Sequence, residues 1–533
     1  MKKLLLAIAV SVGIQAFAAQ FTTEQKLADF HVLNAMIEAS YAPYLYKTEA
    51  LKIDTGALKA DYEQRIATTT SNEEFYYKLV QYVAEFRDGH FGVRIPTNYV
   101  SYLPIRTELV EGKILIESVD RKLLPSEKFP FEKGDEVVSL DGRAAADVLA
   151  EIHTYINSGF EKTRDRIAAW SIFTRSARRL PAPEGKLRVE IRRGTSSLVE
   201  AVELDWMHSG TKTVETVGPV SSPMALGAVQ PFGINELSAF DVYEDFLNGP
   251  AESGFMCSGG TRTAIPADAT VIRKEPFVAY YYATAKGNVG YLRIPHYMPE
   301  SQEAYRERFA QYEAAVDTLE KNTVGLIIDQ DHNCGGRVDF LEDFLGLFMT
   351  QAYQPTSFQL RADKATIVSL ESEIEQSKGM TGTIDYEQLV KDTEIVRKAW
   401  QAGDFLSPKI FFTRAPHYPN PIHYTKPIIV LIDELSGSGG DAFPALIQGY
   451  GRAKLLGTRT SGLGGHINSM PALPFSRLSL SMTRSLFFRP DGVPVENNGA
   501  EPDIPYSITR DDFLYEYRAY QRFYTDQLLA LIP

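Results

Sequence analysis

The stretch PIIVLIDELSGSGGDAFPALIQGYGRAKLLG, Pro427–Gly457, predicts the local architecture around which the rest of the chain is arranged. It begins with a continuous apolar run, Ile428–Ile432, whose length and β-branched content are typical of a strand buried on both faces. A turn of Gly and Ser follows, and Asp441 then opens a helical segment that extends to Tyr450. A glycine-flanked Ser438 between strand and helix predicts a nucleophile beside backbone N–H groups that can stabilise an oxyanion. The alternative is an ordinary Gly/Ser-rich loop.

The composition is that of a globular protein of more than one domain. The chain has 533 residues, 44% of them hydrophobic and 23% charged, and a formal net charge of −13. This length predicts two or three domains. The negative charge argues against nucleic acid as a partner, because phosphate binding needs a basic surface. Two cysteines, Cys257 and Cys334, leave a disulfide or two buried thiols equally open. No His-Glu-x-x-His motif or cysteine cluster occurs, so we expect no metal and no cofactor.

Residues 1–18 are typical of a secretory signal peptide. Lys2 and Lys3 precede the apolar stretch Leu4–Ile14, and Ala16–Ala18 provides small residues for cleavage. The apolar stretch is too short to span a bilayer, and no other stretch of the sequence is long enough. We therefore expect an exported chain, periplasmic or secreted, without a membrane span.

The region Ser436–Gly457 resembles the nucleophile region of the C-terminal-processing (tail-specific) serine proteases. Their pattern is Ser-Ala-Ser-Ala-Ser-Glu, a helix, Gly-Arg-Ala and a strand; matched position by position, Ser438 takes the nucleophile place and Gly451–Ala453 follows the helix. Those enzymes carry a lysine base in a Gly-Lys-Gly turn, whereas this chain has Gly462–Gly464 with leucine in the middle. Leucine cannot accept a proton, so the base for Ser438 must come from elsewhere.

Two further segments resemble the same superfamily and imply a histidine base and an acidic partner. His90 follows Asp-Gly, similar to the Asp-x-His segment that carries the catalytic histidine of the tricorn protease and of the chlamydial protease-like activity factor. Glu496, in the segment Val493–Ile504, matches the acidic member of the tricorn-type set. The tricorn type has a serine before its histidine, where this chain has Gly89, so Glu496 is expected to act on His90 directly, through water or electrostatically. His466 is the rival base, because it follows the turn that holds the lysine in the dyad enzymes.

The turn Gln330–Gly336 resembles the Asp-x-Arg-x-Asn-x-Gly-Gly turn of this superfamily. In relatives a glycine N–H of this turn helps to form the oxyanion hole, which implies that role for Gly335 and Gly336, together with Gly439 after the nucleophile. Paired glycines present backbone donors without side-chain obstruction. His332, within the turn, is expected to be structural.

The resemblance also implies the domain organisation. The run Gly134–Gly142 is similar to the closing strands of a PDZ-like module. We predict an α/β multidomain fold, a crotonase-like (ClpP-type) protease core with an inserted PDZ-like domain and a helical N-terminal segment. The expected parts are 1–18, signal peptide; 19–100, N-terminal helical segment with His90; 101–209, PDZ-like domain; 210–276, linker or insertion; 277–510, protease core with a helical insertion at 361–407; and 511–533, C-terminal helix.

These features predict an exported serine endopeptidase that cleaves proteins or peptides through an acyl-enzyme on Ser438, with His90 as general base and Glu496 in support. The alternative is a non-catalytic protein on the same fold that binds peptides or hydrophobic ligands. A homo-oligomer is left open.

Overall fold

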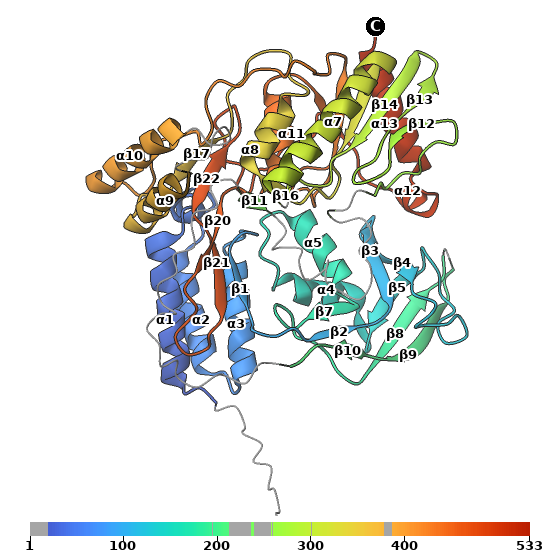
Figure 1. Ribbon diagram of the computed structural model, residues 1–533. Helices are drawn as coiled ribbons and strands as arrows, with labels where there is room; N and C mark the ends of the chain where they lie inside the picture. Colours follow the sequence, from blue (N-terminus) through green and yellow to red (C-terminus); the bar gives the residue numbers. More distant parts are fainter. Residues whose placement is uncertain are drawn as a thin grey trace, which may run out of the picture.

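The computed structural model describes residues 20–194, 196–212, 236–238, 257, 260–299, 301–377 and 386–533. The predicted signal peptide at 1–18 lies outside the described residues, as does most of the predicted insertion at 210–276. Figure 1 shows the core sheet with its helices as one layer, and below it the N-terminal helices and a separate β-rich module side by side. In the described part of the chain, no helix combines the length and the hydropathy that crossing a membrane requires.

The N-terminal segment is helical, with α1 (Thr23–Ser40), a π-helical turn η1 (Tyr46–Ala50), α2 (Thr55–Ala67) and α3 (Asn72–Ala84). Thr22 and Gln25 form a reciprocal capping box at the start of α1, which satisfies backbone donors that a helix leaves unpaired. Ser71 caps α3 in the same way through the N–H of Glu74. The buried faces of these helices pack around Phe30, Phe75 and Tyr82, and on strand β21 (Ser479–Thr483).

The β-rich module follows. Its main sheet has the order β3-β4-β5-β8-β9, and helices α4 (Ala145–His153) and α5 (Glu161–Trp170) pack against it. A hairpin at Glu-Gly-Lys joins β3 to β4, and Glu111 and Gly112 both have positive φ, as a two-residue type I′ turn requires. A second, small sheet has the order β10-β2-β7. The strands are β2 (Val100–Tyr102), β3 (Ile105–Val110), β4 (Lys113–Val119), β5 (Glu136–Leu140), β6 (Arg143–Ala144), β7 (Thr174–Ser176), β8 (Lys186–Arg192), β9 (Val199–Asp205) and β10 (Met207–Ser209).

The core sheet has the order β12-β13-β14-β15-β18-β19-β23, and its strands from β14 to β23 run parallel. Strand β18 (Ile428–Ile432) is buried on both faces, as its apolar run predicts. Its residues Ile428, Val430 and Ile432 face the cluster that contains α7, α8 and α11, whereas Ile429 and Leu431 face α13. The other members are β12 (Thr270–Arg273), β13 (Ala279–Thr284), β14 (Gly287–Arg293), β15 (Gly325–Asp329), β19 (Lys454–Gly457), β23 (Ile504–Pro505), α7 (Gln302–Asn322), α8 (Val338–Leu345), α11 (Gly439–Gly449) and α13 (Arg518–Leu531).

Several short elements surround this core. Strand β11 pairs antiparallel with β16, β17 pairs with β22, and β21 lies between β1 and β20. Helices α9 and α10 lie side by side in the region where a helical insertion was expected (Figure 1). These elements are β1 (Gly92–Arg94), β11 (Glu236–Ser238), β16 (Gly335–Arg337), β17 (Ser357–Leu360), α9 (Lys364–Ser377), α10 (Tyr386–Ala402), β20 (Ile467–Met470) and β22 (Ser485–Phe488).

Two details extend or correct the sequence-based expectations. The predicted single C-terminal helix is two helices, α12 (Arg510–Leu514) and α13, because Glu516 and Tyr517 both adopt positive φ between them. Cys257 and Cys334 form a disulfide with a Cα–Cα distance of 5.4 Å. The predicted α/β multidomain fold, with N-terminal helices, a separate β-rich module and a mostly parallel core sheet, is confirmed.

Candidate active site

Ser438 lies on the sharp turn between β18 and α11, immediately before the first residue of the helix. Its backbone has φ 61° and ψ −112°, a conformation that non-glycine residues rarely adopt and that costs about 1–3 kcal/mol. The turn is held by Gly437 N, which donates to Asn333 O at 2.9 Å, and by Ser438 N, which donates to Asp441 Oδ2 at 2.7 Å. Ser438 is buried, and among the described residues its Oγ has no hydrogen-bond partner. The hydroxyl is therefore free to meet a base or a substrate.

Ser436, two residues earlier, is engaged differently. Its Oγ lies 2.8 Å from Gln330 O and 3.0 Å from Asp433 Oδ1, so this hydroxyl belongs to the framework of the turn. Of the two neighbouring serines, Ser438 is the one whose side chain is uncommitted.

Asp441, in the first turn of α11, joins the nucleophile turn to the Gly-Leu-Gly turn. Its carboxylate accepts from Gly462 N at 2.8 Å, from Leu463 N at 2.9 Å and from the hydroxyl of Thr460, besides Ser438 N. Burial raises the pKa of Asp441 to about 6, although these donors act in the opposite direction. Leu463, at the lysine position of the dyad enzymes, is buried in the apolar core of the β-rich module.

The glycine turn that precedes α8 meets the nucleophile turn backbone to backbone. A Cβ placed on Gly439 would lie 3.0 Å from Gly335 Cα and 3.2 Å from Gly336 N, so only glycines allow this approach. Gly335 and Gly336 have φ of 76° and 143°, conformations that favour glycine. The N–H of Gly335 already donates to Asn333 Oδ1 at 2.8 Å. Of the three predicted oxyanion-hole donors, Gly335 N is therefore already engaged within its own turn.

One strand occupies the outer edge of this glycine turn. Strand β11 pairs antiparallel with β16, with Leu237 opposite Gly336. An extended substrate that added to the same edge would compete with β11 for it.

His90 is buried in the loop that joins α3 to β1, and several segments hold that loop. Its backbone N–H donates to Asp88 Oδ1 at 2.8 Å, while Asp88 Oδ2 accepts from the hydroxyls of Tyr41 at 2.8 Å and Thr483 at 2.7 Å. From the β-rich module, Asn157 Nδ2 donates to Phe91 O at 2.6 Å. These contacts fix the backbone on both sides of the imidazole.

Glu496 is also fully buried, and its two oxygens have different partners. Oε1 forms an ion pair with Lys47 from η1, and Oε2 accepts from Gly464 N at 3.0 Å. A Cβ on Gly464 would lie 2.4 Å from Glu496 N, so this approach requires glycine. Burial and the nearby charge of Asp88 raise the pKa of Glu496 to about 8, whereas the Lys47 ammonium lowers it.

Lys47 also donates to Arg87 O at 3.0 Å, three residues before His90. Glu496 and the His90 loop thus lie on either side of one buried cation.

His466, the rival base, lies in a different environment. Its Nδ1 is 2.7 Å from Ser485 Oγ, and its ring packs against Phe358 and Phe412, with centroid distances of 4.7 and 5.0 Å. The ring is part of the aromatic cluster next to β17 and β22. This placement favours His90 over His466 as the base.

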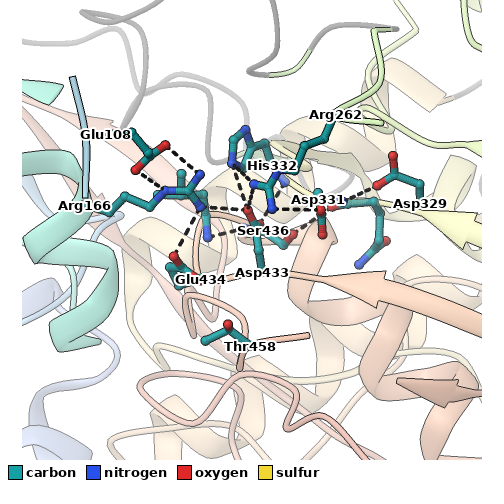
Figure 2. A network of polar contacts seen from close by, with 12 residues as sticks. Glu108, Arg166, Arg262, Asp329, Asp331, His332, Asp433, Glu434, Ser436 and Thr458 are labelled. Atoms are coloured by element: carbon teal, nitrogen blue, oxygen red, sulfur yellow. Dashed lines mark hydrogen bonds and ion pairs between the residues drawn. The ribbon is translucent and has the colours of Figure 1, made fainter. Parts of the chain in front are cut away.

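A buried ionic network supports the nucleophile turn from the side of the β-rich module, and Figure 2 shows it around Asp433, the residue that follows β18. Arg166 of α5 makes a bidentate pair with Glu108, both distances being 2.9 Å, and its Nη1 lies 3.0 Å from Asp433 Oδ2. His332 N donates to Asp433 Oδ1 at 2.9 Å, and Arg262 Nη2 lies 3.3 Å from Asp433 Oδ2. Burial opposes the charged form, but the His332 side chain, whose Nε2 lies 2.9 Å from Oδ2, and then Arg166 and Arg262 hold the pKa of Asp433 well below its ordinary range. His332 belongs to this framework, in keeping with the structural role expected for it.

The segment that joins α4 to α5 contacts the other parts of the site. The hydroxyl of Thr163 donates to Glu434 O at 2.6 Å, and Phe160 lies under the guanidinium of Arg459 at 3.8 Å. A Cβ on Gly159 would lie 1.6 Å from Asn497 Nδ2 and 2.8 Å from Arg87 O. One segment of the β-rich module therefore packs on the nucleophile turn, the Glu496 segment and the His90 loop.

Among the described residues one group has the composition of a metal site. His153, Glu161 and Asp165, on α4 and α5, place potential ligand atoms within 4.8 Å of one another. Glu161 is exposed, and His153 also forms ion pairs with both carboxylates. We assign no metal to this group.

Sequence reasoning missed Lys47, Arg166 and Asp441 as parts of the site. Lys47 has no local pattern that distinguishes it from other lysines, and it lies 449 positions from Glu496. Arg166 reaches Asp433 across 267 positions. Asp441 was expected only to open a helix.

Known families and proteins resemble this chain in sequence and in fold. Residues 288–506 match peptidase family S41, and residues 99–212 match a PDZ domain. A protein of Chlamydia trachomatis is 25% identical over 99% of this chain and 96% of its own length. A carboxy-terminal-processing protease of Bartonella bacilliformis is 23% identical over 45% of this chain and 43% of its own length. The crystal structure of mature CPAF superimposes with a TM-score of 0.79 at 22% identity, over 96% of this chain and 98% of that one. The chain is therefore a serine peptidase with a peptidase S41 domain at residues 288–506 and a PDZ domain at residues 99–212, and it shares the fold of mature CPAF.

Proposed function

We propose that the chain is an exported endopeptidase that cleaves proteins or peptides through an acyl-enzyme on Ser438. The observation that carries this proposal is the conformation of Ser438, whose strained backbone presents an uncommitted hydroxyl beside the touching backbones of Gly439 and Gly336. Strain of this kind persists only where the surroundings impose it, and nucleophile turns are a common place for it. Export is supported by the signal-peptide pattern of residues 1–18.

In this mechanism His90 is the general base. It takes the proton from Ser438 Oγ as the oxygen attacks the scissile carbonyl, and it returns that proton to the leaving amine. The N–H groups of Gly439 and Gly336 stabilise the oxyanion, and the carboxylate of Glu496 stabilises the imidazolium electrostatically. Water then attacks the acyl-enzyme with the same base and the same donors.

Hydrolysis of an unfolded protein substrate tests the proposal, with Ser438→Ala compared against Ser436→Ala. We expect Ser438→Ala to abolish hydrolysis without changing the unfolding transition, because its Oγ has no hydrogen-bond partner among the described residues. Ser436→Ala should lower stability by about 1–2 kcal/mol, because its hydroxyl is hydrogen-bonded and buried, and should leave substantial activity.

Retained hydrolysis in purified Ser438→Ala would contradict the proposal. Absence of hydrolysis in the wild-type protein, together with tight binding of the same unfolded chain, would favour the non-catalytic peptide-binding alternative.

A further inference from the structure

Lys47 is a fully buried lysine at the centre of the candidate site, and the proposed mechanism does not use it. Its ammonium contacts three acceptors: Glu496 Oε1, Asn497 Oδ1 and Arg87 O. An ammonium has three N–H donors and no lone pair, so each donor has one partner. With its donors used in this way, Lys47 is a cation that cannot take the proton of Ser438.

The three acceptors belong to the two segments that carry His90 and Glu496. Asn497 Nδ2 itself donates to Arg87 O at 2.7 Å, so the acidic segment is bound to the His90 loop directly as well as through the ammonium. Arg87 and Asn497 both have positive φ. With this backbone conformation, the carbonyl oxygen of Arg87 and the side chain of Asn497 meet the Lys47 ammonium. The turn η1 thus supplies one cation at the junction of two segments that lie far apart in the sequence.

The charges around Lys47 give it a second role. Asp88 and Glu496 are both buried and act on each other as like charges, and Lys47 is the cation that contacts Glu496. Tyr41, which donates to Asp88, and Tyr46, which interacts with Glu496 from η1, are titratable groups that also face this pair. Two buried carboxylates without a cation would favour protonation of one of them.

We propose that Lys47 is a positioning residue of the peptidase reaction, which favours the carboxylate form of Glu496 and holds it in register with the His90 loop. This inference rests on the proposed function. Lys47 keeps its three protons throughout, while the transferred proton passes from Ser438 Oγ to His90 and then to the leaving amine. Lys47 contributes by favouring the negative charge on Glu496 when the imidazolium of His90 forms.

The test compares Lys47→Met with Lys26→Met. Lys26 is the matched control, because it is also buried and also donates to three oxygens, but these belong to Thr69 and Ser71 in the N-terminal helical segment. We expect Lys47→Met to lower kcat roughly 10²-fold with KM changed by less than about twofold, as for the loss of a group that acts on the transition state. Lys26→Met should lower stability and leave kcat unchanged.

The dependence of kcat on pH distinguishes a positioning role of Lys47 from a purely structural one. Without the ammonium, Glu496 keeps its proton up to a higher pH, so the kcat of Lys47→Met, taken relative to the wild type at the same pH, should recover partly as the pH rises from about 6 to about 9. In the double variant Lys47→Met, Glu496→Gln the side chain at position 496 can no longer ionise, so this relative recovery should disappear. The double variant also removes both buried charges, and it provides a folded protein for the kinetic comparison if Lys47→Met alone unfolds.

A low kcat in the folded double variant, with no recovery at high pH, supports the proposal. An unchanged kcat in Lys47→Met, or full activity in the double variant, overturns it. Wild-type protein that neither hydrolyses protein nor reacts with a fluorophosphonate shows instead that the proposed function is wrong.

Discussion

Asp433 and Asp441 lie on either side of Ser438, and both are buried, but their charges are stabilised by different groups. Asp433 contacts two guanidinium groups, those of Arg166 and Arg262, and its pKa lies well below the ordinary range. Asp441 accepts hydrogen bonds from backbone N–H groups and from the hydroxyl of Thr460, and its pKa rises to about 6. Neutral donors offset burial less completely than charged ones do.

The two aspartates therefore have different roles beside the nucleophile turn. Asp433 is a permanent anion that ties the core to the PDZ domain through Arg166. Asp441 orders the nucleophile turn and the Gly462–Gly464 turn with uncharged donors. Variants that remove donors from one aspartate should therefore change its pKa and the stability that its carboxylate provides.

Loss of Arg166 should have the largest effect on stability. Arg166→Met leaves the buried carboxylates of Glu108 and Asp433 without their main cation, which should destabilise the protein by about 3–5 kcal/mol. Urea unfolding measures this, and Arg188→Met is the control, because Arg188 lies on β8 of the same domain and pairs with Glu190 at the surface. That exposed pair should contribute less than about 1 kcal/mol.

The same variant should change the acid limb of the stability curve. A depressed pKa stabilises the folded protein above the pKa of the unfolded chain, and this stability is lost as the pH falls through the folded pKa. Because Arg166→Met raises the pKa of Asp433, the loss of stability below about pH 4 should be smaller in the variant than in the wild type. An acid limb of unchanged size would contradict the assignment of Asp433 as the permanent anion.

Asp441→Asn should have the next largest effect. The amide can accept through one oxygen, but its NH₂ group would face N–H donors that now bind Oδ2, those of Ser438 and Leu463. Unpaired buried donors cost about 1–3 kcal/mol each, so we expect a loss of about 2–4 kcal/mol together with a large fall in hydrolysis. Unchanged hydrolysis in a stable Asp441→Asn would show that the nucleophile turn does not depend on this carboxylate.

The smallest effect, and the most pH-dependent, is expected for Thr460→Val. This change removes the hydroxyl donor to Asp441 and raises the pKa of Asp441 further. A raised carboxyl pKa destabilises the folded state only above the unfolded pKa, and increasingly as the pH rises. The variant should therefore lose about 1 kcal/mol more at about pH 7.5 than at about pH 5. Equal losses at the two pH values would mean that the lost acceptor for Ala500 N accounts for the whole effect.

The features of the fold that could be predicted from the sequence are those set by residues close together in the chain. The strand over Ile428–Ile432 and the helix after Ser438 were predicted from local signals, apolar content and turn residues, and both formed as expected. In the C-terminal segment the amphipathic pattern concealed a break, because the positive φ of Glu516 and Tyr517 is not encoded by a glycine or a proline.

The charges that assemble the site could not be predicted in this manner. Lys47 and Arg166 act on residues hundreds of positions away, and neither lies in a motif that one sequence can reveal. For Glu496 the sequence implied a partner of His90 but did not indicate the cation beside it.

The central claim is that Ser438 is a nucleophile activated by a histidine from the N-terminal segment. Mass spectrometry of the native protein after fluorophosphonate treatment tests it most directly, with His90→Ala measured in parallel. We predict a single adduct, on Ser438, that forms in the wild type and is lost in His90→Ala, because an unactivated serine reacts slowly. No adduct in the wild type, an adduct on Ser436, or equal labelling of His90→Ala would contradict the claim.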